Sequence, residues 1–543
     1  MTGRFAVAID TRANTLTAAV PLPAPRTDLL RVLGAVGYEN SGGASWLDGA
    51  SPIHDLAFAR GDTPGVEYVQ SVVDAVTAFA GSETGWQDHP QSAVLSGALD
   101  VSAAVGVLDL RKARQGKTEH PALGKGLHTF LYRSELRLGE GVTGTGNGTL
   151  YAGPYQPYLV WLPEGSRAGL PLVVYLHGTG QIHTSAVNVA PYSPSTHNSQ
   201  LGLPDALFDF PAVVAWPLGR GPAQQYVGAS EQDVLDVTDD LLFRLALDED
   251  RVMLAGLSMG GMGTFRLAEL YPDRWSLAYS DVGVDNTGMP ENLTALPVRL
   301  QNGAPDYLVN IGLALATRQA LEDAGTVEYA HWILARKHHQ AAFALAECVY
   351  RSSFSRPRVH NPARVRYTVD PALAVDDPKT GLKLTYDGAY WVSGMRPAGA
   401  ARGSVDLTSH AFASLPVAQP TTRGAYQNVT APRDFCGTDT DVATRDAWDE
   451  QRRQVVQQPN LQRRAVVTGT VTGLSAVTLD ARRAGVSSGA LDLVTDHDVQ
   501  LTLIGLVPGT LVRTDAGGVA ADASGRALIT LPPGEHHVSL DAP

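Results

Sequence analysis

Little cysteine, little charge and no long apolar run characterise this chain, and each shortage excludes a class of protein. Only Cys348 and Cys436 occur in 543 residues, so the chain is not a disulfide scaffold, and neither cysteine has the neighbours of a metal site or a CxxC redox pair. They form either one disulfide or two buried thiols. The formal net charge of −13 argues against nucleic acid or an anionic membrane surface as a partner. No apolar stretch approaches the roughly 20 residues that span a bilayer.

The first residues lack the charged and apolar segments of a signal peptide. The protein is therefore either cytoplasmic or the mature form of a secreted protein whose Met1 is an added start. Low charge, abundant glycine, proline and threonine, and β-rich flanks favour the secreted form. The oligomeric state is left open by the sequence.

The length and the changes of pattern predict several domains. We expect an N-terminal β-rich domain over 1–150, an α/β domain over 151–355, a mixed β and loop region over 356–460, and a C-terminal β-sandwich-like domain over 461–543. Within the flanks the patterns predict a hairpin of strands 5–10 and 15–20, a helix over 65–80, a linker over 141–148, a helix or loop over 434–461, and strands over 364–369, 499–504 and 527–531.

The middle of the chain alternates buried strands with helices, which indicates an α/β fold with a mostly parallel sheet. The apolar runs predict strands over 158–162, 172–176, 212–216, 252–255 and 297–301, and the helical patterns cover 231–245, 261–270, 317–324 and 340–350.

One motif in this region carries a chemical prediction. Residues 256–260 spell G-x-S-x-G between a predicted strand and a predicted helix, which is the setting of a nucleophile elbow. The turn holds Ser258 in a strained conformation, and the flanking glycines avoid collisions with the neighbouring backbone. Its hydroxyl is thereby raised above the carboxyl edge of the sheet.

A serine nucleophile needs a base, and the base needs an orienting acid. Loops after later strands should supply them in the order Ser, Asp, His. Asp306 follows the strand at 297–301 and is the predicted acid, with Asp281 and Asp285 as alternatives. The base is His338 or His339, with His338 the first choice.

Two other histidines have different predicted roles. His331 lies within a strand and is predicted to be structural, whereas His177 precedes a glycine turn. The amide of Gly178 or Thr179, together with that of Met259, is predicted to stabilise the oxyanion.

Ordered motifs extend this pattern from residue 158 to residue 274. They are YLVWLP at 158–163, LHGTG at 176–180, GRG at 219–221, YVG at 226–228, EQDV at 231–234, DEDRV at 248–252, GLSMGG at 256–261 and YPDR at 271–274. Over roughly 155–350 the chain resembles the prolyl-oligopeptidase-like and polyhydroxybutyrate-depolymerase-like serine hydrolases of the α/β-hydrolase superfamily. The resemblance implies a triad of Ser258, Asp306 and His338 or His339. The chain departs from the pattern at two places. It has Asn302-Gly303 before the acid, where such enzymes often have a histidine, and it has Lys337-His338-His339 where Gly-His is common.

These observations predict a serine esterase that acts through an acyl-enzyme, without metal or organic cofactor, on a small-molecule or polymeric ester. A peptidase on the same machinery is the alternative, although residues 1–150 show no propeller repeat. A non-catalytic binding protein with a hydrolase-like core is the alternative from another class.

Overall fold

The computed structural model describes residues 126–183 apart from 140, 141, 145 and 154, residues 211–335, 337–339, 349, 353–426 and 448–543. Before residue 126 it describes residue 111 and short strands, of which the first two form the predicted hairpin. These strands are β1 (Val7–Asp10), β2 (Thr15–Ala18), β3 (Leu29–Leu30), β4 (Leu33–Gly34), β5 (Gly37–Asn40), β6 (Gly43–Trp46), β7 (His54–Asp55), β8 (Gln70–Ser71) and β9 (Leu108–Asp109). Of the predicted helix over 65–80, the structure describes only residues 70–71, and these form the strand β8 instead.

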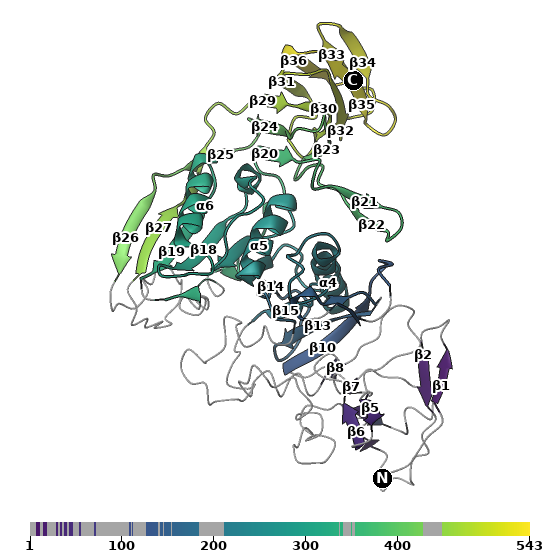
Figure 1. Ribbon diagram of the computed structural model, residues 1–543. Coiled ribbons are helices and arrows are strands. Elements are labelled where there is room, and N and C mark those ends of the chain that lie inside the picture. The colour runs from purple at the N-terminus through teal and green to yellow at the C-terminus, as the bar shows by residue number, and fades with distance from the viewer. Residues whose placement is uncertain are drawn as a thin grey trace.

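The largest sheet formed by the described residues contains ten strands and lies in the middle of the molecule (Figure 1). In spatial order they are β10 (Gly126–Arg133), β13 (Tyr155–Leu162), β15 (Val213–Pro217), β14 (Leu172–Leu176), β16 (Val252–Leu257), β17 (Leu277–Asp281), β18 (Val298–Gly303), β19 (Tyr329–Leu334), β27 (Trp448–Arg453) and β26 (Thr422–Tyr426).

This core sheet is mixed. The strands from β15 to β19 pair in parallel, whereas β10, β13, β27 and β26 join the two edges by antiparallel pairing. Strands β14, β15, β16 and β17 are buried along their whole length, as expected where helices cover both faces of parallel strands. The carboxyl ends of the parallel strands meet at one edge, which places the loops after β14, β16, β18 and β19 near one another.

Three long helices pack against the described strands. α4 (Ala229–Leu245) contacts β10 and β15, α5 (Met259–Leu270) contacts β14, β16 and β17, and α6 (Ile311–Asp323) contacts β18. α6 begins earlier than the predicted helix, because Asn310 caps it by accepting the Gly312 amide at 2.7 Å. The predicted helix over 340–350 lies outside the described residues, apart from residue 349.

A buried carboxylate ties α4 to α5 and to a segment beyond the sheet. Glu231 of α4 is fully buried and accepts hydrogen bonds from Arg266, Tyr271 and Tyr386 at 2.7 to 2.9 Å. A buried charge is tolerated only when it is paired and hydrogen-bonded in this way. The network therefore fixes α5, which begins directly after Ser258.

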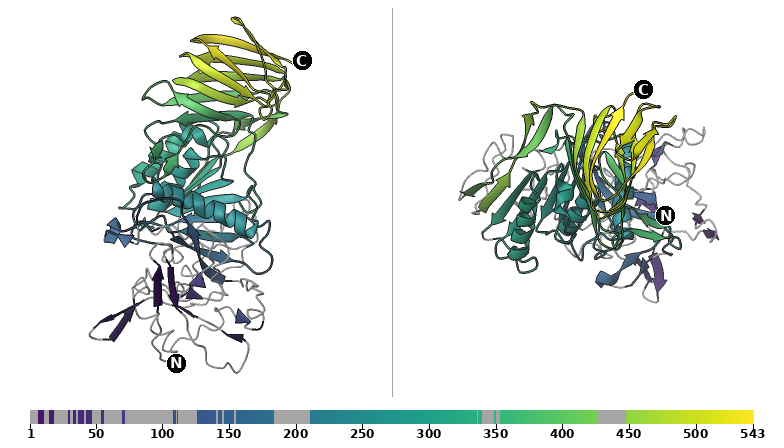
Figure 2. Two further views of the ribbon diagram at one scale, coloured as in Figure 1. Left: turned by 90° about the vertical axis from the view of Figure 1, so that its right-hand side faces the viewer. Right: turned by 90° about the horizontal axis from the view of Figure 1, so that it is seen from above.

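Two further sheets share one apolar core and form a two-layer sandwich at the C-terminal end of the molecule (Figure 2). One contains β20 (Arg364–Val369), β24 (Gly403–Ser409), β29 (Val466–Thr472), β31 (Gly489–Thr495), β36 (Gly534–Asp541), β33 (Leu511–Thr514) and β34 (Gly517–Ala520); the other contains β23 (Val392–Pro397), β30 (Leu474–Asp480), β32 (Val499–Ile504) and β35 (Ala527–Leu531). Strands on both sides of residue 461 therefore pair within each sheet.

The remaining elements are short. They are β11 (Val142–Thr143), β12 (Leu150–Tyr151), β21 (Val375–Asp377), β22 (Leu382–Leu384), β25 (Ser414–Ala418), β28 (Val455–Pro459) and the 3-10 helices Gly146–Gly148 and Pro290–Leu293. The predicted linker over 141–148 contains β11, which pairs with β12. The segment 434–461 was expected to be a helix or a loop, but its described part forms β27 and β28.

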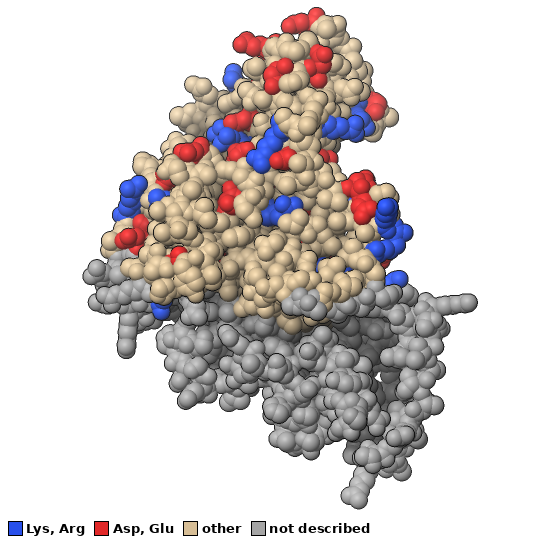
Figure 3. Space-filling view, viewed as in Figure 1, with Lys and Arg blue, Asp and Glu red and all other residues tan. Residues whose placement is uncertain are grey.

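Acidic and basic side chains of the described residues are interspersed on the face shown in Figure 3, and no continuous basic surface is visible among them. None of the described helices combines the length and the apolar character needed to cross a membrane.

Candidate active site

Ser258 lies in the tight turn between β16 and α5. Its backbone has φ 56° and ψ −114°, a region that non-glycine residues rarely occupy and that marks stored strain. A Cβ atom at Gly256 would lie 2.3 Å from the Gly260 carbonyl oxygen, and one at Gly260 would lie 2.1 Å from that of Leu176. The two motif glycines are therefore required by the close approach of three chain segments. The Ser258 amide donates to the Asp281 carbonyl oxygen at 2.8 Å, which anchors the turn to β17.

His339 connects the serine to the predicted acid. Its Nε2 lies 2.8 Å from Ser258 Oγ, and its Nδ1 lies 2.8 Å from Asp306 Oδ2. Asp306 is 5% exposed, and its other oxygen accepts the amides of Leu308 and Val309 at 2.8 and 3.0 Å. Because an ionised carboxylate only accepts hydrogen bonds, Nδ1 carries the proton and Nε2 is left to accept the serine hydroxyl.

His338, the first choice for the base, does not contact Ser258 in this structure. It is exposed, and its Nδ1 lies 3.0 Å from the Pro305 carbonyl oxygen. Adjacent residues on this loop point in different directions, so a histidine pair does not reveal from sequence which ring faces inwards. The path of the loop, and not any property of the two side chains, determines which histidine faces Ser258.

Gly303 at the end of β18 permits that approach. A Cβ atom here would lie 1.9 Å from the Lys337 carbonyl oxygen and 2.4 Å from that of His338. Sequence reasoning noted this glycine only as a departure from a related pattern. The sequence did carry a signal for this close approach, because a glycine between a strand and an acidic loop indicates that another backbone segment lies nearby.

The alternative acids do not bond a described histidine. The Asp281 carboxyl accepts from Tyr279 and Gln301 at 3.0 and 3.1 Å, and burial raises its pKa. Asp285 Oδ1 accepts the amides of Thr287 and Gly288 at 2.7 and 2.9 Å.

The two other histidines that the sequence singled out, His331 and His177, are buried. His331 Nε2 lies 3.0 Å from Asn302 Oδ1, and burial lowers the pKa of His331 to about 3. His177 lies between the carbonyl oxygens of Gly178 and Leu218 at 2.9 Å each, and burial lowers its pKa as well. Burial therefore favours the neutral form of both rings at neutral pH, although the two carbonyl acceptors around His177 act in the opposite direction.

The residues predicted for the oxyanion site lie beside the serine. A Cβ atom at Gly178 would lie 3.5 Å from Ser258 Cβ. Met259 begins α5, where the first amides have no partner within the helix. Sequence reasoning did not single out Gln181, whose Oε1 accepts the Gly178 amide at 2.8 Å.

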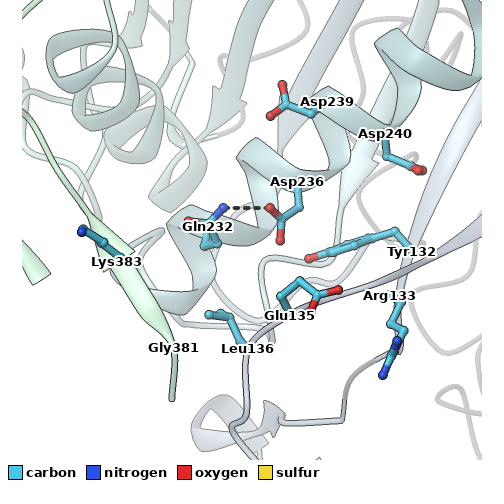
Figure 4. Close-up of a pocket in the computed structure, with 10 residues that line it drawn as sticks. All are labelled: Tyr132, Arg133, Glu135, Leu136, Gln232, Asp236, Asp239, Asp240, Gly381 and Lys383. Atoms are coloured by element: carbon cyan, nitrogen blue, oxygen red, sulfur yellow. Dashed lines mark hydrogen bonds between the residues drawn. The ribbon is translucent and has the colours of Figure 1, made fainter. Parts of the chain in front are cut away.

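A cavity of about 420 Å³ lies elsewhere, between α4, the segment that follows β10, and the β21–β22 hairpin (Figure 4). Its lining includes Asp236, whose pKa is raised to about 6 by burial, and Lys383. Ser258, Asp306 and His339 do not line it. Among the described residues, no group of three or more His, Cys, Asp or Glu is arranged to hold a metal ion. Cys348 and Cys436 lie outside the described residues.

Comparisons with known proteins give fold-level similarities only. No protein-family model matches the sequence, and no curated protein matches it significantly. Similar solved structures include a thermostable esterase (20% identity, TM-score 0.30, covering 38% of this chain and 60% of that one), an S-formylglutathione hydrolase from Agrobacterium tumefaciens (15%, 0.33, 43% and 96%) and a ferulic acid esterase (14%, 0.32, 42% and 98%). The match with the first of these thus spans less than two thirds of its length. Similarity at these scores carries no information about function.

Proposed function

We propose that this protein is a serine hydrolase that cleaves carboxylic esters through an acyl-enzyme. The observation that supports the proposal is His339, which lies 2.8 Å from both the Ser258 hydroxyl and the Asp306 carboxylate. A base that is within hydrogen-bond reach of a nucleophile and is oriented by a carboxylate is the arrangement that activates serine. These contacts support the proposal of an α/β-hydrolase core.

The proposed chemistry follows from these contacts. Ser258 Oγ attacks the ester carbonyl carbon as His339 Nε2 takes its proton. The tetrahedral intermediate then collapses to the acyl-enzyme, and the imidazolium returns the proton to the departing alcohol. Water, deprotonated by His339, hydrolyses the acyl-enzyme and regenerates the Ser258 hydroxyl. Amide groups among Gly178, Thr179 and Met259 stabilise the oxyanion in both steps, and each such donor is worth on the order of 3 kcal/mol of barrier.

The test compares ester and amide substrates on three variants. Wild type is expected to hydrolyse p-nitrophenyl esters and to form a fluorophosphonate adduct on Ser258. Ser258→Ala and His339→Ala should abolish turnover, while the neighbouring His338→Ala should retain at least half of it. Adduct formation without ester turnover, together with hydrolysis of aminoacyl anilides, would favour the peptidase alternative. Absence of both adduct and turnover would favour a non-catalytic protein.

A polymeric ester is the substrate class that we propose within this activity. The C-terminal sandwich has an apolar core of its own, and the proposed chemistry at Ser258 does not use it. Turnover on short esters, long-chain esters, feruloyl esters and polyesters should be compared, each beside Ser258→Ala. Equal rates on soluble esters with no release from any polymer would contradict this part of the proposal. The secreted location expected from composition stays a prediction, as do the four domains and the three boundaries between them.

A further inference from the structure

The turn that follows β14 is closed by the side chain of Gln181. The Gln181 amide donates to the Gly178 carbonyl oxygen at 3.2 Å, and Gln181 Oε1 accepts the Gly178 amide at 2.8 Å. Gln181 therefore bonds both backbone polar groups of one residue. Gly180 has φ 83°, and its amide donates to the Pro222 carbonyl oxygen at 2.8 Å. The turn is thus held internally and is also anchored to the loop after β15.

These bonds divide the amides near the nucleophile into two groups. The amides of Gly178, Gly180 and Gln181 are already engaged. Within the described part of the chain, no hydrogen bond is recorded for the amides of Thr179 and Met259. Thr179 is exposed, and the turn lies against Ser258, since an added methyl at Gly178 would be 3.5 Å from Ser258 Cβ.

An oxyanion donor is most effective when it is fixed and unengaged before the reaction, because no bond then has to break as charge develops. The Gly178 amide would first have to release Gln181. We propose that Gln181 is a positioning residue: it takes up the Gly178 amide and holds the turn so that Thr179, together with Met259, donates to the oxyanion. This inference rests on the proposed ester hydrolysis at Ser258 and narrows the predicted donor set.

The opposite role for Gln181 makes the inference testable. If its amide oxygen only occupies the place of a substrate oxygen, substrate must displace it, and removing it should improve binding or turnover. Gln181→Met keeps the length of the side chain and removes the acceptor. With p-nitrophenyl butyrate, we expect kcat per active site to fall about 10²-fold to 10³-fold, the effect of losing one oxyanion donor, while KM changes less than threefold.

A second variant separates positioning from general loss of structure. Gln181→Glu keeps an acceptor oxygen, but its ionised form puts negative charge near the developing oxyanion. We expect the ratio of its kcat to that of wild type to rise as the pH falls from 7 to 4, through the ordinary glutamate pKa of about 4.3, because the neutral carboxyl resembles the amide. Gln319→Met, on the exposed face of α6, is the matched control and should keep wild-type kcat and KM.

Fluorophosphonate titration of Ser258 counts the competent sites in each preparation. A kcat for Gln181→Met within threefold of wild type would overturn the inference, and so would an increase in kcat/KM or a pH-independent ratio for Gln181→Glu. If Gln181→Met does not fold, the Gln181→Glu ratio decides. Lack of ester turnover in wild type itself would instead refute the proposed function, and this inference with it.

Discussion

Replacing Asp306 by asparagine should remove catalysis while leaving the loop in place. Asp306 Oδ1 accepts two backbone amides, and Oδ2 accepts the His339 Nδ1 proton. In Asp306→Asn the carbonyl oxygen can keep the two amide bonds, which directs the NH2 group at His339. That group donates, so Nδ1 must accept and Nε2 must carry the proton. Nε2 then faces Ser258 as a donor and cannot take its proton.

The expected magnitude follows from this change of tautomer. Trapping the wrong tautomer in a Ser-His-Asp site lowers kcat about 10⁴-fold, which corresponds to about 5.4 kcal/mol of barrier. The free energy of unfolding should change by less than about 1 kcal/mol, because the two loop amides keep their acceptor. Asp306→Ala should lose a similar factor in kcat and, in addition, about 1 kcal/mol of stability, because these two amides lose their acceptor.

The assay is stopped-flow or steady-state hydrolysis of p-nitrophenyl butyrate, with urea unfolding measured on the same samples. Asp285→Asn is the matched control, since Asp285 also accepts two loop amides but contacts no described histidine. It should keep kcat within twofold of wild type. If Asp306→Asn keeps kcat within tenfold of wild type, the tautomer argument is refuted.

Three other predictions concern packing and pH. Gly303→Ala would place a methyl 1.9 Å from the Lys337 carbonyl oxygen, in the loop that carries His339. A shift of that loop by about 1 Å should lower kcat about 10²-fold. Gly399→Ala is the control and should leave kcat unchanged, because its added methyl would have nothing within 4 Å. Tyr386→Phe removes a buried bond to the Glu231 carboxylate and should lower the free energy of unfolding by about 1.5–3 kcal/mol; equal urea midpoints for variant and wild type would contradict this. Burial lowers the pKa of His331 from 6.5 in the unfolded chain to about 3 in the folded protein. As the pH falls, the unfolded chain therefore binds a proton before the folded protein does. Stability should fall as the pH drops from about 6 to about 4, by about 1.4 kcal/mol per pH unit. His331→Gln should make that slope shallower, and an unchanged slope would show that His331 is not its source.

Patterns along the chain predicted the elements around the serine because their signals are local. The apolar runs at 172–176 and 252–255 correspond to β14 and β16. The glycines of the motif are required because a Cβ atom at either Gly256 or Gly260 would lie 2.1 to 2.3 Å from a carbonyl oxygen. The partner of β19 was not predictable in this way. β27 carries the charged sequence WDEQRR, and it pairs with β19 across more than one hundred intervening residues.

The same distinction applies to the candidate site. Ser258 and Asp306 follow strands directly, so their loops could be assigned to one edge of the sheet. The choice of His339 over His338 depends on the path of a loop that passes within contact distance of Gly303. Gln181 was missed because its role is a side-chain bond to its own turn, which composition and periodicity do not encode. Spatial contacts of this kind are outside the reach of a single sequence.

The pairing of β19 with β27 has a consequence for how the chain is made. β19 ends at residue 334, whereas β27 ends at residue 453, and strands β20, β23 and β24 lie between them. Translation at about 5–20 residues per second leaves the outer edge of β19 open on the ribosome for on the order of ten seconds. Such an exposed edge is a template for pairing with another nascent chain. Expression at high ribosome density should therefore favour aggregation, and slower initiation or co-expressed chaperones should increase the soluble yield.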